Sequence, residues 1–359
     1  MKPNHLIGYE ARYGDIPSLD GLRALSIAVV MLSHLAIPQV PGGHGVFLFF
    51  IISGFLITRL LFAEQGAAGI INVRQFYLRR FFRLYPAIIV FCIVVPSAYF
   101  VKDGYLDVIE PASVLLYFSN YLVAFRDLSG AGFQIEPIKI FWSLSVEEHF
   151  YLVFPLIFLL LRSPAKIATV AVIVCVLALA LRVVYAELFP HIVGSHYLYM
   201  RTEFRMDSVA FGVLLAALCE IKSAARWLDL LAKPAAFYGA IVVGLLAILF
   251  GDVYFANVWR YAILGPAICV VILGLIFSPR YAFFQAMLNV PIATFVGRLS
   301  YSLYIWHLPA QAFTWWLFSG WPAVLISVAL SFAIATASFY GVERPMMGVR
   351  RRFGSHSPR

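Results

Sequence analysis

Long apolar runs, interrupted by few charges, constrain this chain more than any other feature. Of its 359 residues, 62% are hydrophobic and 13% are charged, whereas a soluble domain is about half apolar and about a quarter charged. Because about 20 apolar residues cross a bilayer as one helix, each long run is a candidate membrane span. The runs cover 20–37, 44–63, 84–101, 113–125, 142–161, 167–188, 204–220, 235–250, 257–277, 292–314 and 321–342. The sequence therefore predicts an all-α fold, a polytopic integral membrane helical bundle.

The run at 113–125 is too short to span. As a helix its residues would reach about 20 Å, against a hydrocarbon core of roughly 30 Å. We expect a re-entrant or interfacial segment there, which leaves about ten transmembrane helices.

The positions of the basic residues test the predicted number of spans, because Lys and Arg accumulate in cytoplasmic loops. With ten spans, the basic stretch 74–83 and the basic C-terminal residues fall on one side; with eleven they would fall on opposite sides. The first side also holds Arg162, Lys166, Lys222, Arg226, Lys233 and Arg280, whereas the other keeps Lys102, Arg126, Lys139 and Arg201. We therefore expect both termini in the cytoplasm, a membrane-embedded domain over 1–345 and a basic cytoplasmic tail over 346–359.

The net charge of +9 does not indicate a nucleic-acid partner, because the cations lie in loops between apolar runs. The lipid bilayer is the expected surrounding. The four cysteines, Cys92, Cys175, Cys219 and Cys269, lie in apolar segments without paired C-x-x-C spacing. That spacing favours a packing role over a disulfide framework or a zinc site, so no metal site is expected.

Charges inside spans are candidate functional residues, because each costs at least about 2.5–3.5 kcal/mol at the centre of a helix. Arg23 and His34 flank the apolar part of the first run. Eleven residues make about three turns, so both side chains face one way, about 16 Å apart. Arg23 could alternatively be a snorkelling anchor, and His34 a hydrogen-bonded structural histidine.

The run at 142–161 begins with two adjacent carboxylates, Glu147 and Glu148, and Ser143 lies one turn before Glu147 on the same face. This pattern indicates the wall of a polar cavity. A favourable interaction with the helix dipole is the alternative explanation.

Three further polar residues interrupt later runs. Arg205 and Asp207 open the run at 204–220, where they could also form a purely structural ion pair, and His307 lies well inside 292–314. Under the ten-span topology these three fall in the outer half of the membrane together with His34, Glu147 and Glu148. A histidine oriented by a carboxylate is a common general base for a hydroxyl, so this agreement in depth favours group transfer.

On the predicted cytoplasmic side, the stretch 76–86 interleaves arginines and aromatic residues. Arg80 and Arg83, three residues apart, share a helical face. Such a face suits phosphate binding and lipid anchoring equally well.

Seven short strings follow one another along nearly the whole chain. They are Leu19-Asp20-Gly21-Leu22-Arg23-Ala24 leading to His34, Gly45 through Phe49-Phe50 to Ser53-Gly54-Phe55, Arg80-x-x-Arg83 with Tyr85-Pro86, Trp142-Ser143-Leu144 through Glu147-Glu148 to Tyr151 and Pro155, Arg205-x-Asp207 with Gly212, Ser300-Tyr301-Ser302-Leu303-Tyr304 with His307, and Glu343-Arg344-Pro345. In this order they resemble the acyltransferase 3 family, the membrane-bound O-acyltransferases of polysaccharides, lipopolysaccharide, Nod factors and macrolides.

The resemblance implies an acyl-CoA donor, often acetyl-CoA, on the cytoplasmic side of a bacterial inner membrane, and no permanently bound cofactor. It implies a saccharide, glycolipid or glycosylated small-molecule acceptor at or across the membrane. It also implies that His34 is the catalytic histidine, that Arg23 is its functional partner, and that Arg80 and Arg83 contact the phosphates of the donor.

The chain departs from the family pattern at Phe47, where many relatives have Asp, and at His149, where Gln is common. The esterase-like C-terminal domain of some relatives is also not recognisable, so we expect a stand-alone form.

The hypothesis is direct transfer, in which His34, oriented by Glu147 or Glu148, removes the proton of the acceptor hydroxyl. An acyl-enzyme route through Ser33, Ser143 or Ser145 stays open. A transporter or flippase that relays protons through the same residues is the alternative from another class. A structural scaffold explains the charges at one depth poorly.

Overall fold

The computed structural model describes residue 16 and residues 18–35 and 40–350, and these form helices joined by turns and loops. The long helices are α1 (Leu19–His34), α2 (Gly43–Ala68), α3 (Val73–Asp103), α6 (Phe141–Leu161), α7 (Pro164–Leu188), α9 (Thr202–Glu220), α11 (Pro234–Leu249), α13 (Arg260–Phe277), α15 (Pro291–Trp315) and α16 (Gly320–Ser338). The short ones are α4 (Ile109–Leu115), α5 (Ser119–Ser129), η1 (Glu136–Ile140), η2 (Pro190–Ile192), α8 (His196–Met200), η3 (Lys222–Ala224), α10 (Ala225–Leu231), α12 (Val253–Val258), η4 (Pro279–Tyr281), α14 (Ala282–Leu288), η5 (Phe339–Glu343) and α17 (Arg344–Arg350).

The predicted helical membrane bundle is confirmed, and one long helix covers most of each of the ten runs expected to span. In the described part of the chain, six helices are long and apolar enough to cross a membrane, or up to eight if each of two bent pairs is one span. The bent pairs place α9 and α15 at angles of 96° and 69° to the short helices beside them. Helices α1 and α11 have 16 residues each, about 24 Å. The number of ten spans therefore stays a prediction.

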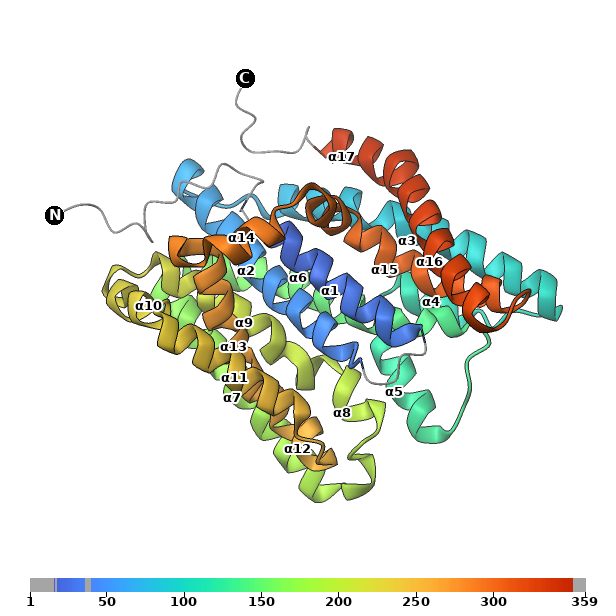
Figure 1. Ribbon diagram of the computed structural model, residues 1–359, viewed down its shortest axis with the longest axis horizontal. Helices are drawn as coiled ribbons and strands as arrows, with labels where there is room; N and C mark the ends of the chain where they lie inside the picture. Colours follow the sequence, from blue (N-terminus) through green and yellow to red (C-terminus); the bar gives the residue numbers. More distant parts are fainter. Residues whose placement is uncertain (1–15, 17, 36–39, 351–359) are drawn as a thin grey trace.

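Successive long helices run in opposite directions, which gives the bundle two distinct ends (Figure 1). One end, called here the basic end, carries the turns at 69–72, 162–163, 221–233 and 278–290. The other, the loop end, carries 104–140, 189–201, 250–259 and 316–319. The lysines and arginines gather at the basic end as expected, but the side of the membrane that it faces stays a prediction. Residues 1–15 and 351–359, with most of the predicted tail, lie outside the described residues.

Glycines allow α2 and α9 to pack closely. A Cβ atom at Gly54 would lie 2.1 Å from the carbonyl oxygen of Val209, and one at Gly212 would lie 2.0 Å from that of Ile51. Small residues are what allow backbones to approach each other within membranes. This crossing therefore explains two glycines of the sequence strings without any catalytic role.

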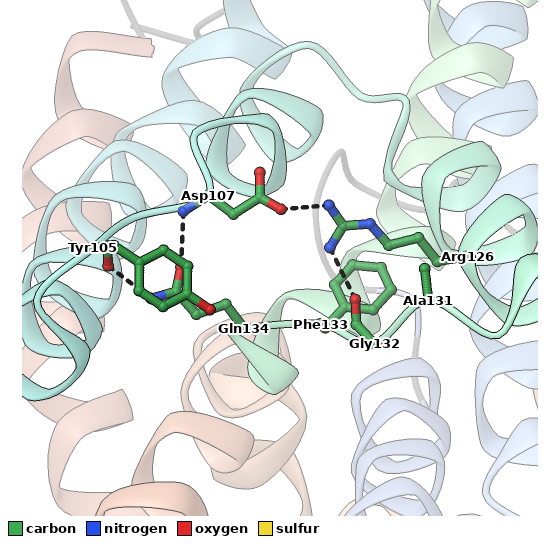
Figure 2. A pocket seen from close by; sticks show the side chains of 7 residues that line it. All are labelled: Tyr105, Asp107, Arg126, Ala131, Gly132, Phe133 and Gln134. Atoms are coloured by element: carbon green, nitrogen blue, oxygen red, sulfur yellow. Dashed lines mark hydrogen bonds and ion pairs between the residues drawn. The ribbon is translucent and has the colours of Figure 1, made fainter.

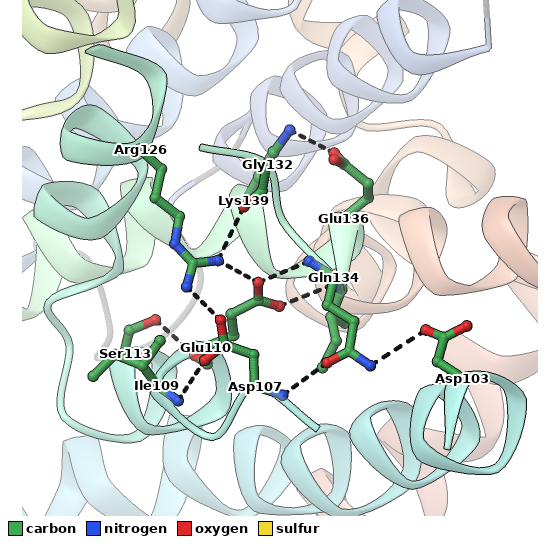
Figure 3. A network of polar contacts seen from close by, with 11 residues as sticks. Asp103, Asp107, Ile109, Glu110, Ser113, Arg126, Gly132, Gln134, Glu136 and Lys139 are labelled. Atoms are coloured by element: carbon green, nitrogen blue, oxygen red, sulfur yellow. Dashed lines mark hydrogen bonds and ion pairs between the residues drawn. The ribbon is translucent and has the colours of Figure 1, made fainter. Parts of the chain in front are cut away.

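The short run at 113–125 forms α4 and α5, separated by a turn in which Tyr117 has φ of 55°. Neither helix is a candidate span. Both are fixed by the fully buried Glu110, whose carboxylate accepts hydrogen bonds from the amides of Gln134 and Ile135, each 2.8 Å long. Figure 3 shows Arg126 joining the same network, where it pairs with Glu110 and Asp107 and donates to the carbonyl of Gly132.

A cavity of about 450 Å³ opens beside this loop-end network. Figure 2 shows the side chains that line it: Tyr105, Asp107, Arg126, Ala131, Gly132, Phe133 and Gln134. The guanidinium of Arg126 stacks on the ring of Phe133 at 4.6 Å and is already engaged by Asp107 and Glu110. The polar groups of this wall therefore hold the loop together.

Candidate functional site

The first part of the site is a group of charges from four elements, called here the arginine–glutamate cluster: Arg23 of α1, Arg80 and Arg83 of α3, Glu147 and Glu148 of α6, and Glu343 of η5. Arg23 is half-buried and lies 3.7 Å from the carboxylate of Asp20. It also interacts electrostatically with Glu147 and Arg83. Residues that the sequence singles out in separate runs are therefore brought together.

The two glutamates are half-buried and face the arginines. Glu147 interacts with Arg23, Arg83 and Arg80, and the hydroxyl of Ser53 lies within hydrogen-bonding reach of its carboxylate. Glu148 interacts with Arg80 and with Glu147. Like charges on Glu147 and Glu148 are thus offset by three arginines, which keeps the cluster polar inside an apolar bundle.

Aromatic side chains line the approach to the cluster. The guanidinium of Arg80 lies 5.5 Å from the ring of Phe76 and 5.3 Å from that of Tyr151, in cation–π geometry. A cavity of about 210 Å³ begins here. It is lined by Tyr77, Arg80, Phe81, Leu84, Tyr85, Tyr117, Glu148, Tyr151 and Leu152. Glu148 is therefore reachable from outside the bundle.

Glu343 is a member of the cluster that sequence reasoning did not select. Its carboxylate is buried, accepts a 2.5 Å hydrogen bond from Ser302 and interacts with Arg83 and Arg23. It lies in a single π-helical turn, a distortion that is frequent at functional sites. The string Glu343-Arg344-Pro345 was the sequence signal that could have identified Glu343. A glutamate near the end of an apolar run, however, is also common at an ordinary helix end.

The second part of the site is a pair of histidines. Nδ1 of His34 lies 2.9 Å from Nε2 of His307, and the rings stack at 5.1 Å. Nδ1 of His307 lies 3.0 and 2.8 Å from the carbonyl oxygens of Leu303 and Tyr304. Carbonyls only accept hydrogen bonds, so we assign the proton of neutral His307 to Nδ1, which leaves Nε2 as an acceptor.

This assignment fixes the state of the exposed His34. Its Nδ1–H donates to His307, so its Nε2 carries a lone pair. His307 is buried, at 4% exposure, whereas His34 is exposed at the end of α1. The pair thus presents a basic nitrogen at an accessible position and keeps it in one tautomer.

Hydroxyl groups connect the two parts of the site. The hydroxyl of Tyr304 lies 2.6 Å from that of Ser143 and donates to the carbonyl of Ile140 at 3.0 Å. The ring of Tyr304 lies 5.9 Å from that of His307, and Ser143 lies one turn before Glu147 in α6. The hydrogen-bonded hydroxyls of Ser143 and Tyr304 therefore lie between the arginine–glutamate cluster and the histidine pair.

This arrangement differs from the expectation that a glutamate orients His34. The side chain at Nδ1 of His34 is His307, while Glu147 and Glu148 lie with the arginines. The reason is the position of the glutamates along α6, one turn or more farther from the loop end than Ser143. The catalytic roles predicted for both glutamates stay predictions.

Arg205 and Asp207 do not form the ion pair with each other that the sequence analysis considered. Residues two apart on a helix do not face each other, and Asp207 instead pairs with Arg182 of α7 at 2.6 Å, both fully buried. Arg205 lies over the rings of Tyr199 and Tyr261, at 4.4 and 3.7 Å. Arg182 was missed, although a lone arginine in an apolar run is itself a signal.

Comparisons with known proteins bear on this geometry. The sequence model of a family described as the acyltransferase domain matches residues 16–341. The O-acetyltransferase OatA of Staphylococcus aureus (strain NCTC 8325 / PS 47) is 30% identical over 357 residues, 94% of this chain and 58% of its own length. Another protein of S. aureus (strain COL) is 30% identical over 353 residues, 92% of this chain and 57% of its own length. The chain thus spans little more than half the length of these relatives. No solved structure matches it.

Proposed function

The chain belongs to the acyltransferase domain family, and from this premise we propose that it transfers an acetyl group from cytoplasmic acetyl-CoA to a hydroxyl of a saccharide or another glycosylated acceptor. The names of the relatives, O-acetyltransferases, support the choice of acetyl. The observation that carries the proposal is the histidine pair, in which the exposed His34 keeps a lone pair on Nε2.

His34 is the proposed general base. Its Nε2 takes the proton of the acceptor hydroxyl while the oxygen attacks the thioester carbonyl. The tetrahedral oxyanion then collapses, the C–S bond breaks, and the proton passes from His34 to the sulfur of CoA. The products are the acetyl ester and free CoA. His307 supports this step because it accepts the hydrogen bond from Nδ1–H and so keeps the lone pair on Nε2.

The arginine–glutamate cluster is proposed to receive the donor. Arg80 and Arg83 lie nearer the basic end in α3, where the phosphates of CoA can be bound bidentately. The extended pantetheine arm would then reach past Arg23 and Ser143 toward His34. Glu147 and Glu148 are proposed to hold the arginines in position.

The test is acetyl transfer by the purified protein in lipid nanodiscs, with radiolabelled acetyl-CoA and a panel of bacterial saccharides. His34→Ala should reduce label transfer about 10²–10⁴-fold, the typical contribution of a general base. His191→Ala, at an exposed histidine of η2, is the matched control and should transfer normally.

Transfer that survives in His34→Ala would exclude His34 as the base. A wild-type protein that binds no acetyl-CoA but carries a saccharide across the bilayer would instead support the transporter alternative.

A further inference from the structure

Arg205 is a buried cation whose hydrogen bonds are incomplete. The residue is 1% exposed, and its Nε and Nη2 have no hydrogen-bond partner among the described residues. The hydroxyl of Tyr261 lies within hydrogen-bonding reach of the guanidinium. A buried charge that is left incompletely paired is costly, so an unused pair of donors in such a place needs an explanation.

The two unused donors lie on the same edge of the guanidinium. Nε–H and Nη2–H point in one direction and together form the side-on fork that binds two oxygens of a carboxylate or a phosphate. Arg182, the other arginine that is fully buried in the described part of the chain, uses its donors within the protein. Arg182 donates from Nε to Val258, from Nη1 to Phe204 and from Nη2 to Asp207. Figure 3 shows the half-buried Arg126 with both terminal nitrogens paired to carboxylates.

A second unpartnered atom lies beside this fork. Nε2 of His44 is buried without a partner among the described residues, and His44 interacts electrostatically with Arg205. Nδ1 of His44 lies 3.1 Å from the carbonyl oxygen of Pro41, so Nε2 of the neutral ring carries a lone pair and accepts a hydrogen bond. The ring of His44 stacks on that of Tyr261 at 6.0 Å. Three polar side chains from α2, α9 and α13 therefore meet at one point near the loop end.

The same point adjoins the histidine pair. Gly42 packs against Ser33, the neighbour of His34, because a Cβ atom there would lie 2.0 Å from the Ser33 hydroxyl oxygen. A Cβ atom at the adjacent Gly43 would lie 2.1 Å from the hydroxyl oxygen of Tyr199, which faces Arg205. The residues at the start of α2 therefore lie between Arg205 and the end of α1.

We propose that the Nε–Nη2 edge of Arg205 binds an anionic group of the acceptor that has two adjacent oxygens, a carboxylate or a phosphate, and that the lone pair of His44 is left for a hydroxyl of the same acceptor. This inference rests on the proposed function, which places the donor phosphates at the arginine–glutamate cluster and leaves the loop end to the acceptor. The enzyme then selects charged saccharides, and Tyr199 and Tyr261 hold the guanidinium in place.

The experiment measures anion binding, so it does not depend on acyl transfer. Thermal unfolding of the purified full chain in nanodiscs is recorded in sodium acetate, in sodium methyl phosphate, in sodium chloride of equal ionic strength, and in the neutral isostere acetamide. The wild-type midpoint should rise by about 1–3 °C in acetate or methyl phosphate relative to chloride and acetamide. The anion that raises the midpoint more identifies the charged group of the acceptor. A larger rise in acetate indicates an acidic sugar, and a larger rise in methyl phosphate indicates a phosphorylated or lipid-linked sugar.

Four variants test whether Arg205 causes the rise in the unfolding midpoint. Arg205→Gln should lose it, and Arg205→Lys, which keeps the charge but not the fork, should lose most of it. Arg201→Gln, one turn away and paired with Glu203, should keep it, as should His34→Ala. A rise that persists in Arg205→Lys and Arg205→Gln, or the absence of any anion-specific rise in the wild type, would overturn the proposal.

Discussion

Two pairs of side chains near the loop end, Arg182 with Asp207 and His34 with His307, differ in how completely their hydrogen-bonding groups are used. Every guanidinium nitrogen of Arg182 donates to an acceptor inside the protein, and its partner Asp207 is fully buried. In the histidine pair the inner ring is held by backbone carbonyls, but the outer ring keeps an accessible nitrogen. A pair whose donors and acceptors are all used within the protein, called here a saturated pair, can only stabilise the fold. A pair that keeps an accessible donor or acceptor can also act on a ligand. The difference predicts which substitutions cost stability and which cost activity.

The largest effect on stability is expected from breaking the saturated pair. Arg182→Met should lower the free energy of unfolding by about 3–5 kcal/mol, because Asp207 is left as an uncompensated buried charge. Thermal and chemical unfolding in detergent would measure the loss. The double variant Arg182→Met/Asp207→Leu should recover most of it, since neither charge then remains. If the single variant unfolds like the wild type, the pair is not the structural element described here.

An effect on donor binding alone is expected within the string 76–86. Arg80→Gln/Arg83→Gln should raise the KM for acetyl-CoA about 10²–10⁴-fold, because hydrogen bonds to charged groups contribute about 1.5–3 kcal/mol each and both arginines are lost. Arg79→Gln is the matched control in the same helix, since Arg79 pairs with Glu64 at 2.7 Å. It should reduce stability and leave this KM unchanged. Equal rises in the two variants would place the donor elsewhere.

The sequence could predict the helices and most charges of the site for one physical reason. A span must satisfy its own backbone within lipid, so apolar runs become helices whatever surrounds them. The cost of a buried charge likewise makes Arg23, Glu147 and Glu148 stand out against their runs. Both arguments use only local composition.

The partners of those charges could not be predicted in the same way. Arg205 and Asp207 are neighbours in sequence but face different helices, and Glu343 meets Arg23 from the far end of the chain. Which face of a helix meets which neighbour depends on packing, such as the close crossing at Gly54 and Gly212. The pairing of His34 with His307 follows from the same packing.

A moderate effect on turnover is expected at the inner histidine. His307→Leu should lower kcat about 10–100-fold, because His34 is no longer held in the tautomer with a lone pair on Nε2. The KM for acetyl-CoA should stay unchanged. His307→Gln offers an amide oxygen that can accept the Nδ1–H of His34, so it should retain more activity than His307→Leu. Equal losses in both variants would indicate that His307 only fills space.

The smallest effect is expected where α5 meets α8 at the surface of the loop end. Partial burial works to raise the pKa of Asp127, but hydrogen bonds from the imidazole and the amide of His196 outweigh it and leave the pKa below 3.8. A lowered folded pKa means that the contact stabilises above the unfolded pKa and is lost as the pH falls through the folded value. For exposed groups the contribution is below about 1 kcal/mol.

Hydrogen exchange at the His196 amide, corrected for intrinsic rate, measures this local contact as the pH is lowered from 5 to about 3. Protection should fall over this range in the wild type and be low and flat in Asp127→Asn. A parallel decline in both would assign the acid response to other groups. A pH-sensitive contact here would extend the contrast between open and saturated charges to the surface of the protein.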